Sequence, residues 1–466
     1  MSKTSQPILH AEQQPARTFP CTDLGNAERL VAAYADRIRW VPDWRSWLVW
    51  DGKHWVRDEK GEILQLAKGA VRSIYNEAAQ ATDKEDSKNL ARFAMASENA
   101  SRIRAMVELA RTESGIPVAV SELDADPWML NASNGTIDLR SGELSPHDPE
   151  RLITKLLPVS YDPLAHSPIW AQFLDSVFKS DSEVKRFVQR AVGYSLTAST
   201  REQIMFVAYG DGSNGKSTFL ETIRELLADY GQQAPTEMLL DRRDAGIPND
   251  IARLRGVRFV SAVETSEGKR LAEATVKQLT GGDTISARFM RGEWFDFRPT
   301  AKIWMATNHR PTIRGIDHGI WRRLLAVPFE QQFDDASRDK ELMLKLRNEL
   351  PGILTWAVEG CLDWQRDGLG VPDTIRDAMA DYRNDQDTVG RFLDECCEAD
   401  PNRWVPAADL YEAYRRWSVS QGESLLAQRQ FGMRLSQRRL VREKLGPQRR
   451  WAWRSLALID FNQPSF

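Results

Sequence analysis

Four short apolar runs alternate with helical patterns in the middle of the chain. After Gln203 these runs read IMFVAY, VRFVSAV, KIWMAT and RLLAVPF, and apolar residues recur at helical spacing between them. Runs of this length, separated by helices, are typical of the buried strands of a parallel sheet. The pattern therefore predicts an α/β core in which helices cover a largely parallel sheet.

Helical and hairpin patterns precede this core. Asp51-Gly52 lies between aromatic segments and predicts a tight hairpin, and the turn-rich stretch NASNGTIDLRSGELSPHDP predicts a second one. Ser167 followed by Pro168 predicts the start of a helix, because proline fits the first helical position. Helical spacing predicts three further helices, over residues 28–38, 62–80 and 86–113.

Five of the 16 tryptophans fall around the first hairpin, between Trp40 and Trp55. Exposed aromatic rings at this density would make a platform for stacking nucleic-acid bases. Packing of a small sheet against helices would use the same residues, and this is the interpretation that we favour.

The length of 466 residues corresponds to about three domains. Residues 1–27 are rich in Gln, Pro, Ser and Thr without periodicity, and we expect them to form a flexible arm. Changes of pattern divide the rest of the chain into a mixed α/β domain over 28–165, an α/β core domain over 166–335, a helical connector over 336–398 and a last domain over 399–466. Around the connector, helices are expected over 338–349, 352–366 and 373–398.

A glycine-rich loop follows the first strand of the core. It fits the pattern G-x-x-x-x-G-K-[ST] and precedes a helical pattern, which is the context that a phosphate-binding loop requires. Backbone N–H groups and the helix N-terminus would bind phosphate oxygens, Lys216 would reach the terminal phosphates and Ser217 would ligate Mg²⁺. The sequence therefore predicts a site for a nucleoside triphosphate with Mg²⁺. The loop residues are Gly210, Asp211, Gly212, Ser213, Asn214, Gly215, Lys216, Ser217 and Thr218.

Polar residues at the ends of later strands predict that the bound nucleoside triphosphate is hydrolysed. Glu264 ends a strand-like run 48 residues after Lys216, where a carboxylate can hold Mg²⁺ through water and polarise the attacking water. Asn308 ends KIWMAT, where its amide can orient that water; the alternative is an asparagine that only begins a turn. Arg322 and Arg323 could offer a guanidinium to a neighbouring subunit's nucleotide, or could lie on a solvated strand edge.

Five segments in this order resemble the superfamily 3 helicase module of phage and plasmid primase-helicases, which is related to the poxvirus primase-helicase. They are GDGSNGKST, SAVETSEGKRL, KQLTGGDTISARFM, KIWMATNHRPTIRG and IWRRLLAVPF. A looser likeness covers residues 28–160, where DPWMLNASNGTIDLRSGEL is similar to the domain that precedes the helicase in that family. The resemblance implies an AAA+ type P-loop ATPase core that assembles as a ring, usually a hexamer.

The resemblance also implies roles for single residues. It makes Gly210–Thr218 the ATP loop, Glu264 the Walker B acid, Asn308 the sensor and Arg322 or Arg323 the arginine finger. It implies a pore-facing hairpin formed by Thr284–Met290 and Trp294–Pro299, with Arg288 and Arg291 as candidates for contacting DNA or as structural ion-pair partners.

The sequence departs from the family pattern at the Walker B position. A lone Glu264 is followed by Thr265 rather than by a second acid. Glu267 could be that second acid or a solvated glutamate in a loop, and its role is left open.

The net charge of −3, from 63 basic and 66 acidic residues, gives no overall reason to expect nucleic acid as a partner. The charge is uneven, however, because eleven Lys or Arg residues and only three Asp or Glu residues lie between Tyr411 and Arg454. Helical patterns over 406–417 and 427–438, followed by a basic hairpin, predict a winged-helix domain that docks on duplex DNA; a surface for a neighbouring subunit is the alternative. The candidate DNA contacts are Arg434, Arg438, Arg439, Arg449 and Arg450.

Cysteines and histidines predict no further chemistry. Cys21, Cys361, Cys396 and Cys397 lack the spacing of a disulfide framework or metal site, which favours a reducing compartment, and the six histidines lack zinc-ligand spacing. The chain shows neither a signal-peptide pattern nor 18 successive apolar residues. We therefore expect a soluble protein in the cytoplasm of a bacterial host, with no membrane partner.

These features predict an ATP-dependent DNA helicase that forms a ring, moves 3′ to 5′ on a single strand in its pore and replicates a phage, plasmid or other mobile element. The alternative is an origin-binding initiator or regulatory AAA+ ATPase that binds DNA without processive unwinding. A small-molecule kinase is disfavoured, because no acceptor-substrate lid follows the loop. A primase domain commonly precedes the helicase in the resembled family, whereas only residues 1–27 precede the first folded domain here, so we expect a separate primase or no primer synthesis.

Overall fold

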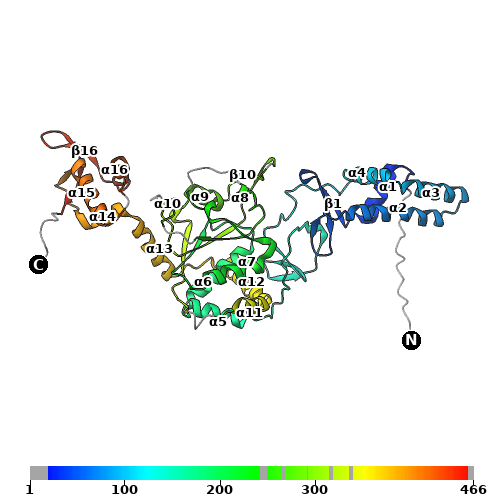
Figure 1. Cartoon of the computed structure of the whole chain (residues 1–466), viewed down its shortest axis with the longest axis horizontal. Coiled ribbons are helices and arrows are strands. Elements are labelled where there is room, and N and C mark those ends of the chain that lie inside the picture. Colours follow the sequence, from blue (N-terminus) through cyan, green and yellow to red (C-terminus); the bar gives the residue numbers. More distant parts are fainter. Residues whose placement is uncertain are drawn as a thin grey trace, which may run out of the picture. The chain divides into compact units, whose positions relative to one another are not determined.

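The computed structural model describes residues 19–241, 249–264, 268–290, 292–313, 318–334, 339–423 and 425–459. The chain divides into two compact units (Figure 1). The first comprises residues up to Asp138 together with Glu143–Tyr161, and the second comprises Leu139–Gly142 and the residues from Asp162 onward. Among the described residues, no helix is both long enough and apolar enough to span a bilayer.

Helices and two small antiparallel sheets build the first unit. Apolar side chains of the helices, such as Leu30, Val71 and Met106, pack with Ile38 and Trp47 of the first sheet into one buried core. The helices are α1 (Asp23–Tyr34), α2 (Glu62–Gln80), α3 (Lys84–Ser97) and α4 (Ala100–Ala110). The sheets are β1 (Ile38–Val41), β2 (Ser46–Trp50) and β3 (Trp55–Arg57), and β4 (Met129–Ala132), β5 (Gly135–Asp138) and β6 (Glu143–Ser145).

Three sequence predictions for this unit needed correction. The helix expected over 86–113 is two helices, because the Asn99 side chain accepts from the Ser101 N–H and begins α4 as an N-cap. The helix expected over 28–38 begins earlier, at Asp23 behind the N-cap Thr22, and Ile38 already belongs to a strand. The second predicted hairpin has a third strand, β6, paired with β5.

The hairpin at Asp51-Gly52 is confirmed, since β2 and β3 pair antiparallel with Trp50 opposite Trp55. Trp47 and Trp55 are buried, and the ring pairs Trp40–Trp47 and Trp50–Trp55 lie 5.4 and 5.6 Å apart between centroids. The tryptophans thus pack the small sheet, as the favoured interpretation expected.

The central sheet of the second unit is parallel throughout, as predicted. Its strand order is β13-β7-β12-β9-β8, and every neighbouring pair runs parallel. The order places strands from three distant parts of the chain side by side, so that their carboxyl ends meet at one edge. The strands are β7 (Met205–Tyr209), β8 (Gly231–Gln233), β9 (Phe259–Glu264), β12 (Lys302–Thr307) and β13 (Leu324–Pro328).

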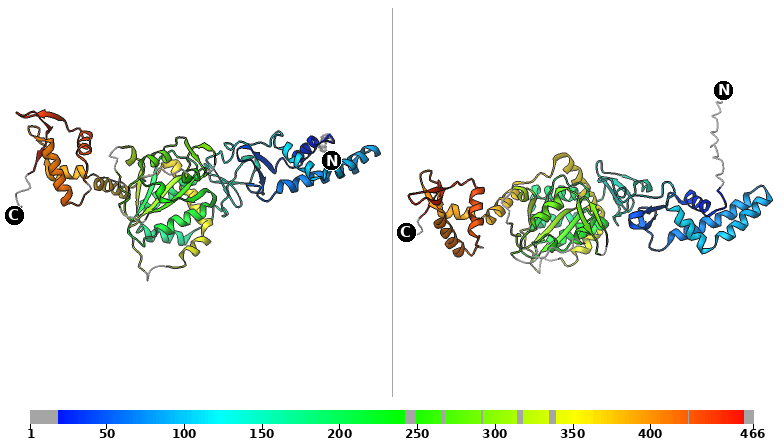
Figure 2. Two further views of the ribbon diagram at one scale, coloured as in Figure 1. Left: turned by 45° about the horizontal axis from the view of Figure 1, so that its top comes forward. Right: turned by 90° about the horizontal axis from the view of Figure 1, so that it is seen from above.

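Helices of the second unit surround this sheet (Figure 2). A separate hairpin, β10 (Ile285–Arg288) with β11 (Trp294–Phe297), pairs antiparallel where the sequence predicted one. The helices before and within the core are α5 (Pro168–Val177), α6 (Ser182–Leu196), α7 (Lys216–Leu227), α8 (Asn249–Ala252), α9 (Glu273–Gly281) and α10 (His318–Trp321). Those that follow it are α11 (Leu342–Asn348), α12 (Leu350–Asp367) and α13 (Asp373–Gln386).

The start of α5 is capped from a distant part of the chain. The sequence assigned this start to Ser167 and Pro168, and the helix does begin there, but the Ser167 side chain makes no capping hydrogen bond. Instead the Glu349 carboxylate accepts from the N–H groups of Ile169 and Trp170, at 3.0 and 2.9 Å. A carboxylate at a helix N-terminus satisfies unpaired donors and interacts favourably with the helix dipole.

The C-terminal part of the second unit combines three helices with a three-stranded sheet. The helix predicted over 373–398 is two helices, because the Asp387 side chain accepts from the Gly390 N–H and starts a new one. Phe392, Tyr414, Phe431 and Trp453 pack in the core of this part. The elements are α14 (Thr388–Cys396), β14 (Cys397–Glu398), β15 (Trp404–Pro406), α15 (Ala407–Ser420), α16 (Gln428–Gln437), β16 (Arg442–Leu445), β17 (Arg450–Arg454) and β18 (Ala457–Leu458).

Candidate functional site

The predicted loop and the two predicted strand-end residues meet at the carboxyl edge of the central sheet. In the register of the strands, Thr307 pairs with Tyr209 on one side and with Glu264 on the other. The glycine-rich loop begins directly after Tyr209, and Asn308 directly follows Thr307. Loop, carboxylate and amide therefore lie together although they are far apart in the sequence.

Close packing fixes the course of the loop. At Gly210, with φ +151°, a Cβ atom would lie 2.1 Å from the Phe329 carbonyl oxygen. At Gly215, with φ +85°, it would lie 2.9 Å from a methyl group of Val177. The buried Asn214 amide donates to the Phe329 carbonyl at 2.8 Å and holds the loop against β13. Only glycine tolerates these two positions without a shift of the backbone.

Lys216 is the buried cation at the centre of the site, with a relative exposure of 6%. Its ammonium group donates to Asn214 Oδ1 at 2.9 Å, to Asn308 Oδ1 at 3.2 Å and to the Gly210 carbonyl. Burial lowers the pKa of this ammonium from 10.5 to about 8, and the nearby Asp211 partly offsets the shift. The phosphate groups of a nucleotide would bring further negative charge to this ammonium group.

A cavity of 1290 Å³ extends from the loop across the sheet edge. Its lining includes Ser217, Glu264 and Asn308 together with side chains of α5 and α11. The volume exceeds the usual range of small-molecule pockets, roughly 300–1,000 Å³. The residues that line it away from the loop include Ile169, Gln172, Phe173, Leu342, Met343 and Lys345. No sequence motif marks these residues, because α5 and α11 reach the cavity only through the fold.

The donor set suits Mg²⁺ held mainly by phosphate and water. Ser217 and Glu264 line the same cavity and carry the oxygen ligands that Mg²⁺ prefers. Among the described residues, no group of three or more His, Cys, Asp or Glu side chains could hold a metal ion. Mg²⁺ usually binds through one or two protein ligands together with substrate phosphates, so the two candidates fit this ion.

Arg322 and Arg323 lie at the amino-terminal end of β13, whereas the glycine-rich loop lies at the carboxyl ends of the strands. They directly precede β13, whose first residue Leu324 pairs with Met205, and the Met205 N–H donates to the Arg323 carbonyl at 2.7 Å. The five residues of β13 separate them from the loop by about 16 Å. Neither arginine can therefore reach the glycine-rich loop of its own chain.

The two arginines differ in exposure. Arg322 is exposed, and its guanidinium donates to Gln203 Oε1 at 3.2 Å. Arg323 is half-buried and donates to the Gly319 carbonyl at 2.7 Å. Exposure favours Arg322 as the side chain that another subunit could receive.

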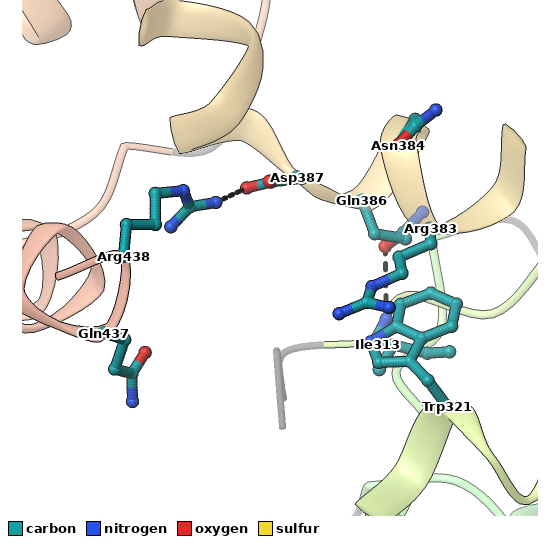
Figure 3. Close-up of a pocket in the computed structure, with 8 residues that line it drawn as sticks. All are labelled: Ile313, Trp321, Arg383, Asn384, Gln386, Asp387, Gln437 and Arg438. Carbon is teal, nitrogen blue, oxygen red and sulfur yellow. Dashed lines mark hydrogen bonds and ion pairs between the residues drawn. The ribbon is translucent and has the colours of Figure 1, made fainter. Parts of the chain in front are cut away.

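The segment after Asn308 is held by several contacts against the end of α13. The sequence did not predict these contacts. Arg310 lies over the Tyr209 ring, 4.1 Å from its centroid, and pairs with Asp385 at 3.6 Å. The Tyr382 hydroxyl donates to the Pro311 carbonyl, and the Ile313 N–H donates to the side chain of Gln386 at 3.1 Å. Figure 3 shows the last of these bonds. Arg310 stands in the quoted segment KIWMATNHRPTIRG, but a lone arginine there gives no signal without the fold.

The predicted DNA contacts differ in their surroundings. Arg288 lies 5.0 Å from the centroid of the exposed Trp294 on the β10–β11 hairpin. Arg438 forms an ion pair with Asp387 (Figure 3), and Arg434 is half-buried. The remaining predicted contacts, Arg439, Arg449 and Arg450, are exposed. Arg291 and Glu267 lie outside the described residues.

Three family descriptions match parts of the chain. The family described as "D5 N terminal like" matches residues 27–179, a family of unknown function matches residues 208–323, and the family described as "Poxvirus D5 protein-like" matches residues 384–453. The chain carries D5-family domains. This agrees with the resemblance to the poxvirus primase-helicase that the motifs gave.

Viral proteins are among the curated relatives of this chain. It is 24% identical over 328 residues to a "Putative helicase" of Acanthamoeba polyphaga mimivirus, covering 65% of this chain and 34% of that protein. It is 27% identical over 313 residues to a "Putative helicase" of Frog virus 3, covering 62% and 30%. It is 23% identical over 326 residues to a "Putative primase" of African swine fever virus, covering 64% and 34%. The chain thus spans about a third of the length of these relatives.

Solved structures show the same fold. The apo structure of the C-terminal region of NrS-1 aligns with a TM-score of 0.53 at 10% identity, covering 90% of this chain and 95% of that one. A second apo structure of this region aligns with a TM-score of 0.51 and covers 93% and 99%. The chain and this region therefore share their architecture over nearly their whole lengths.

Proposed function

We propose that this chain is a Mg²⁺-dependent ATPase with an AAA+ type core, which assembles as a ring around DNA and unwinds duplex during replication of a mobile genetic element. The observation that carries the proposal is the cluster of Lys216, Glu264 and Asn308 at one edge of a parallel sheet. A phosphate-loop lysine, a strand-end carboxylate and a strand-end amide are the groups that ATP hydrolysis needs. The similarity to viral proteins named as helicases supports the assignment.

Residues of the loop would hold the triphosphate. The N-terminus of α7 offers unpaired N–H groups to its oxygens, and the Lys216 ammonium would exchange Asn214 and Asn308 for phosphate. Bound Mg²⁺ would neutralise charge on the phosphates, and Ser217 and Glu264 are the residues that would hold it. Release of Asn308 from Lys216 would leave its amide available to orient the attacking water.

A second subunit would complete the site. Arg322 lies at the sheet edge opposite the loop and is exposed, so it can stabilise transition-state charge only on the nucleotide of another copy. This geometry supports a closed ring, usually a hexamer, in which each interface joins the loop of one subunit to the arginine of the next.

Two surfaces would contact DNA. The β10–β11 hairpin carries Arg288 and the exposed side chains Phe289, Met290 and Trp294, and would face a single strand in the pore. The C-terminal helices and hairpin would serve as a winged-helix module, and their exposed Arg439, Arg449 and Arg450 would contact duplex phosphates. We further propose movement from 3′ to 5′ on the pore strand, and primer synthesis by a separate primase.

An initiator or regulatory ATPase is the alternative, since the basic C-terminal part alone would serve origin binding. Strand displacement on a forked duplex with ATP and Mg²⁺ decides between the two functions. We expect unwinding by the wild type and its loss in Lys216→Ala. Protection of one DNA sequence without any unwinding would instead establish the initiator.

A further inference from the structure

The wing hairpin, β16 and β17, carries an exposed tryptophan between two cations. Trp451 is 50% exposed. The Arg442 guanidinium carbon lies 5.1 Å from the centroid of its ring, and the Lys444 ammonium nitrogen lies 5.4 Å from it. Such distances are typical of cation–π contacts, which hold the ring in place and concentrate positive charge around it.

Strand register explains why these side chains share one face of the wing. Lys444 pairs with Trp451, and Arg442 pairs with Trp453. Cross-strand partners point to the same side of a sheet, so all four side chains lie on one face. Trp453 is only 2% exposed and belongs to the buried core, whereas Trp451, two positions earlier on the strand, extends beyond it.

The acidic residue of the wing lies on the other face. Glu443 pairs in register with Ala452, and its carboxylate lies 3.7 Å from the guanidinium of Arg454. The face around Trp451 therefore combines an aromatic surface with positive charge. Arg449 and Arg450 add further exposed cations at the turn and the start of β17.

We propose that this face binds an unpaired nucleic-acid base, which stacks on Trp451 while Arg442 and Lys444 contact the neighbouring phosphates. In a continuous duplex the faces of the bases are covered by their neighbours, so an exposed indole can stack only on a single strand, a flipped base or the end of a duplex. The face thus recognises a junction or a single strand, beyond the duplex contact assigned above to this domain. It depends on DNA binding by the chain but not on ATP hydrolysis.

The test measures DNA binding by the full chain without nucleotide, using fluorescence anisotropy. Three probes of equal length are compared: a single strand, the same strand with abasic sites, and a duplex with both ends capped so that no base face is exposed. Trp451→Ala is expected to weaken binding of the base-containing strand by about 5- to 150-fold. It should change binding of the abasic strand and of the duplex little, because both depend on phosphate contacts.

Further variants separate stacking from folding and from other aromatic contacts. Trp451→Phe keeps an aromatic face and should retain most of the affinity for the base-containing strand. Val419→Ala removes another exposed apolar side chain of the same domain, 73% exposed, and should change nothing. The same comparison in a Trp294→Ala background removes stacking at the β10–β11 hairpin, which carries another exposed tryptophan.

Two results would overturn the proposal. Equal losses for all three probes would show that Trp451 supports the fold or the phosphate contacts only. Unchanged binding of the base-containing strand by Trp451→Ala would show that the face does not bind bases and would point to a protein partner instead. Lys216→Ala tests the ATPase separately, since it should leave the ratio between base-containing and abasic affinities unchanged even if no ATP turnover is found in the wild type.

Discussion

The ammonium nitrogen of Lys216 lies 3.2 Å from the amide oxygen of Asn308, although 92 positions separate the two residues in the sequence. The contact exists because parallel strands β7 and β12 end in register, so that the helix after one and the turn after the other share an edge. It connects the residue expected to bind phosphate with the residue expected to orient water.

Replacement of Lys216 by alanine should reduce ATP turnover by about 10²- to 10³-fold, because a preorganised charge at the phosphates is lost. A coupled assay of phosphate release measures it. Thermal unfolding of the same variant without ATP should show no large loss of stability, since the buried ammonium is costly to desolvate. Turnover near the wild-type rate in Lys216→Ala would contradict the assigned site.

The lowered pKa of Lys216 makes stability depend on pH. The ammonium has a pKa of about 8 in the folded chain against 10.5 for a model lysine, so between these values the unfolded chain binds more protons. This residue therefore contributes a rise in the free energy of unfolding as pH increases from about 8 to 10.5. Denaturant unfolding of wild type and Lys216→Met at several pH values isolates the contribution, which should be absent from the variant.

Binding of ATP should weaken as pH rises above about 8, because phosphate favours the protonated form of Lys216. Titration with a non-hydrolysable ATP analogue, followed by calorimetry in two buffers of different ionisation enthalpy, should reveal proton uptake on binding. Binding that is equally tight at pH 7 and pH 9, without proton uptake, would contradict the prediction.

Glu349→Ala should destabilise the second unit by about 1–2 kcal/mol, since two N–H groups at the start of α5 lose their acceptor. Denaturant unfolding measures the loss. Glu359→Ala is a matched control, because Glu359 is exposed on α12, and its replacement should change stability little. Since α5 lines the cavity, Glu349→Ala should also weaken ATP binding.

Mixing two inactive variants should restore activity if the arginine acts on a neighbouring subunit. Lys216→Ala lacks a working loop and Arg322→Ala lacks the finger, so each ring alone should be inactive. In equal mixtures about a quarter of the interfaces would join an intact loop to an intact arginine. ATP turnover at roughly this fraction of wild type is expected. Arg323→Ala in place of Arg322→Ala serves as the comparison that identifies the finger.

Elements with a strong local pattern could be predicted from the sequence. The parallel strands and the hairpin at Asp51-Gly52 follow from local patterns that need no knowledge of the rest of the chain, whereas the hairpin over 284–299 follows from the family resemblance. Helix breaks at Asn99 and Asp387 were missed, since the apolar spacing continues across both caps. The motif residues of the site can be named from the sequence, whereas Met343 reaches the cavity only through tertiary packing. The same holds for the contacts of Arg310 with Tyr209 and of Glu349 with the start of α5.

The end of α13 receives both the segment after Asn308 and the helix α16. Within the six residues from Tyr382 to Asp387, four side chains bind Arg310, Pro311, Ile313 or Arg438. Asp387 also caps α14. Its ion pair with Arg438 therefore restrains the junction between α13 and α14. A shift of Asn308 would therefore be passed to α16 over a very short distance. An anion that competed with Asp387 for Arg438 would break this ion pair and would allow the junction between α13 and α14 to bend.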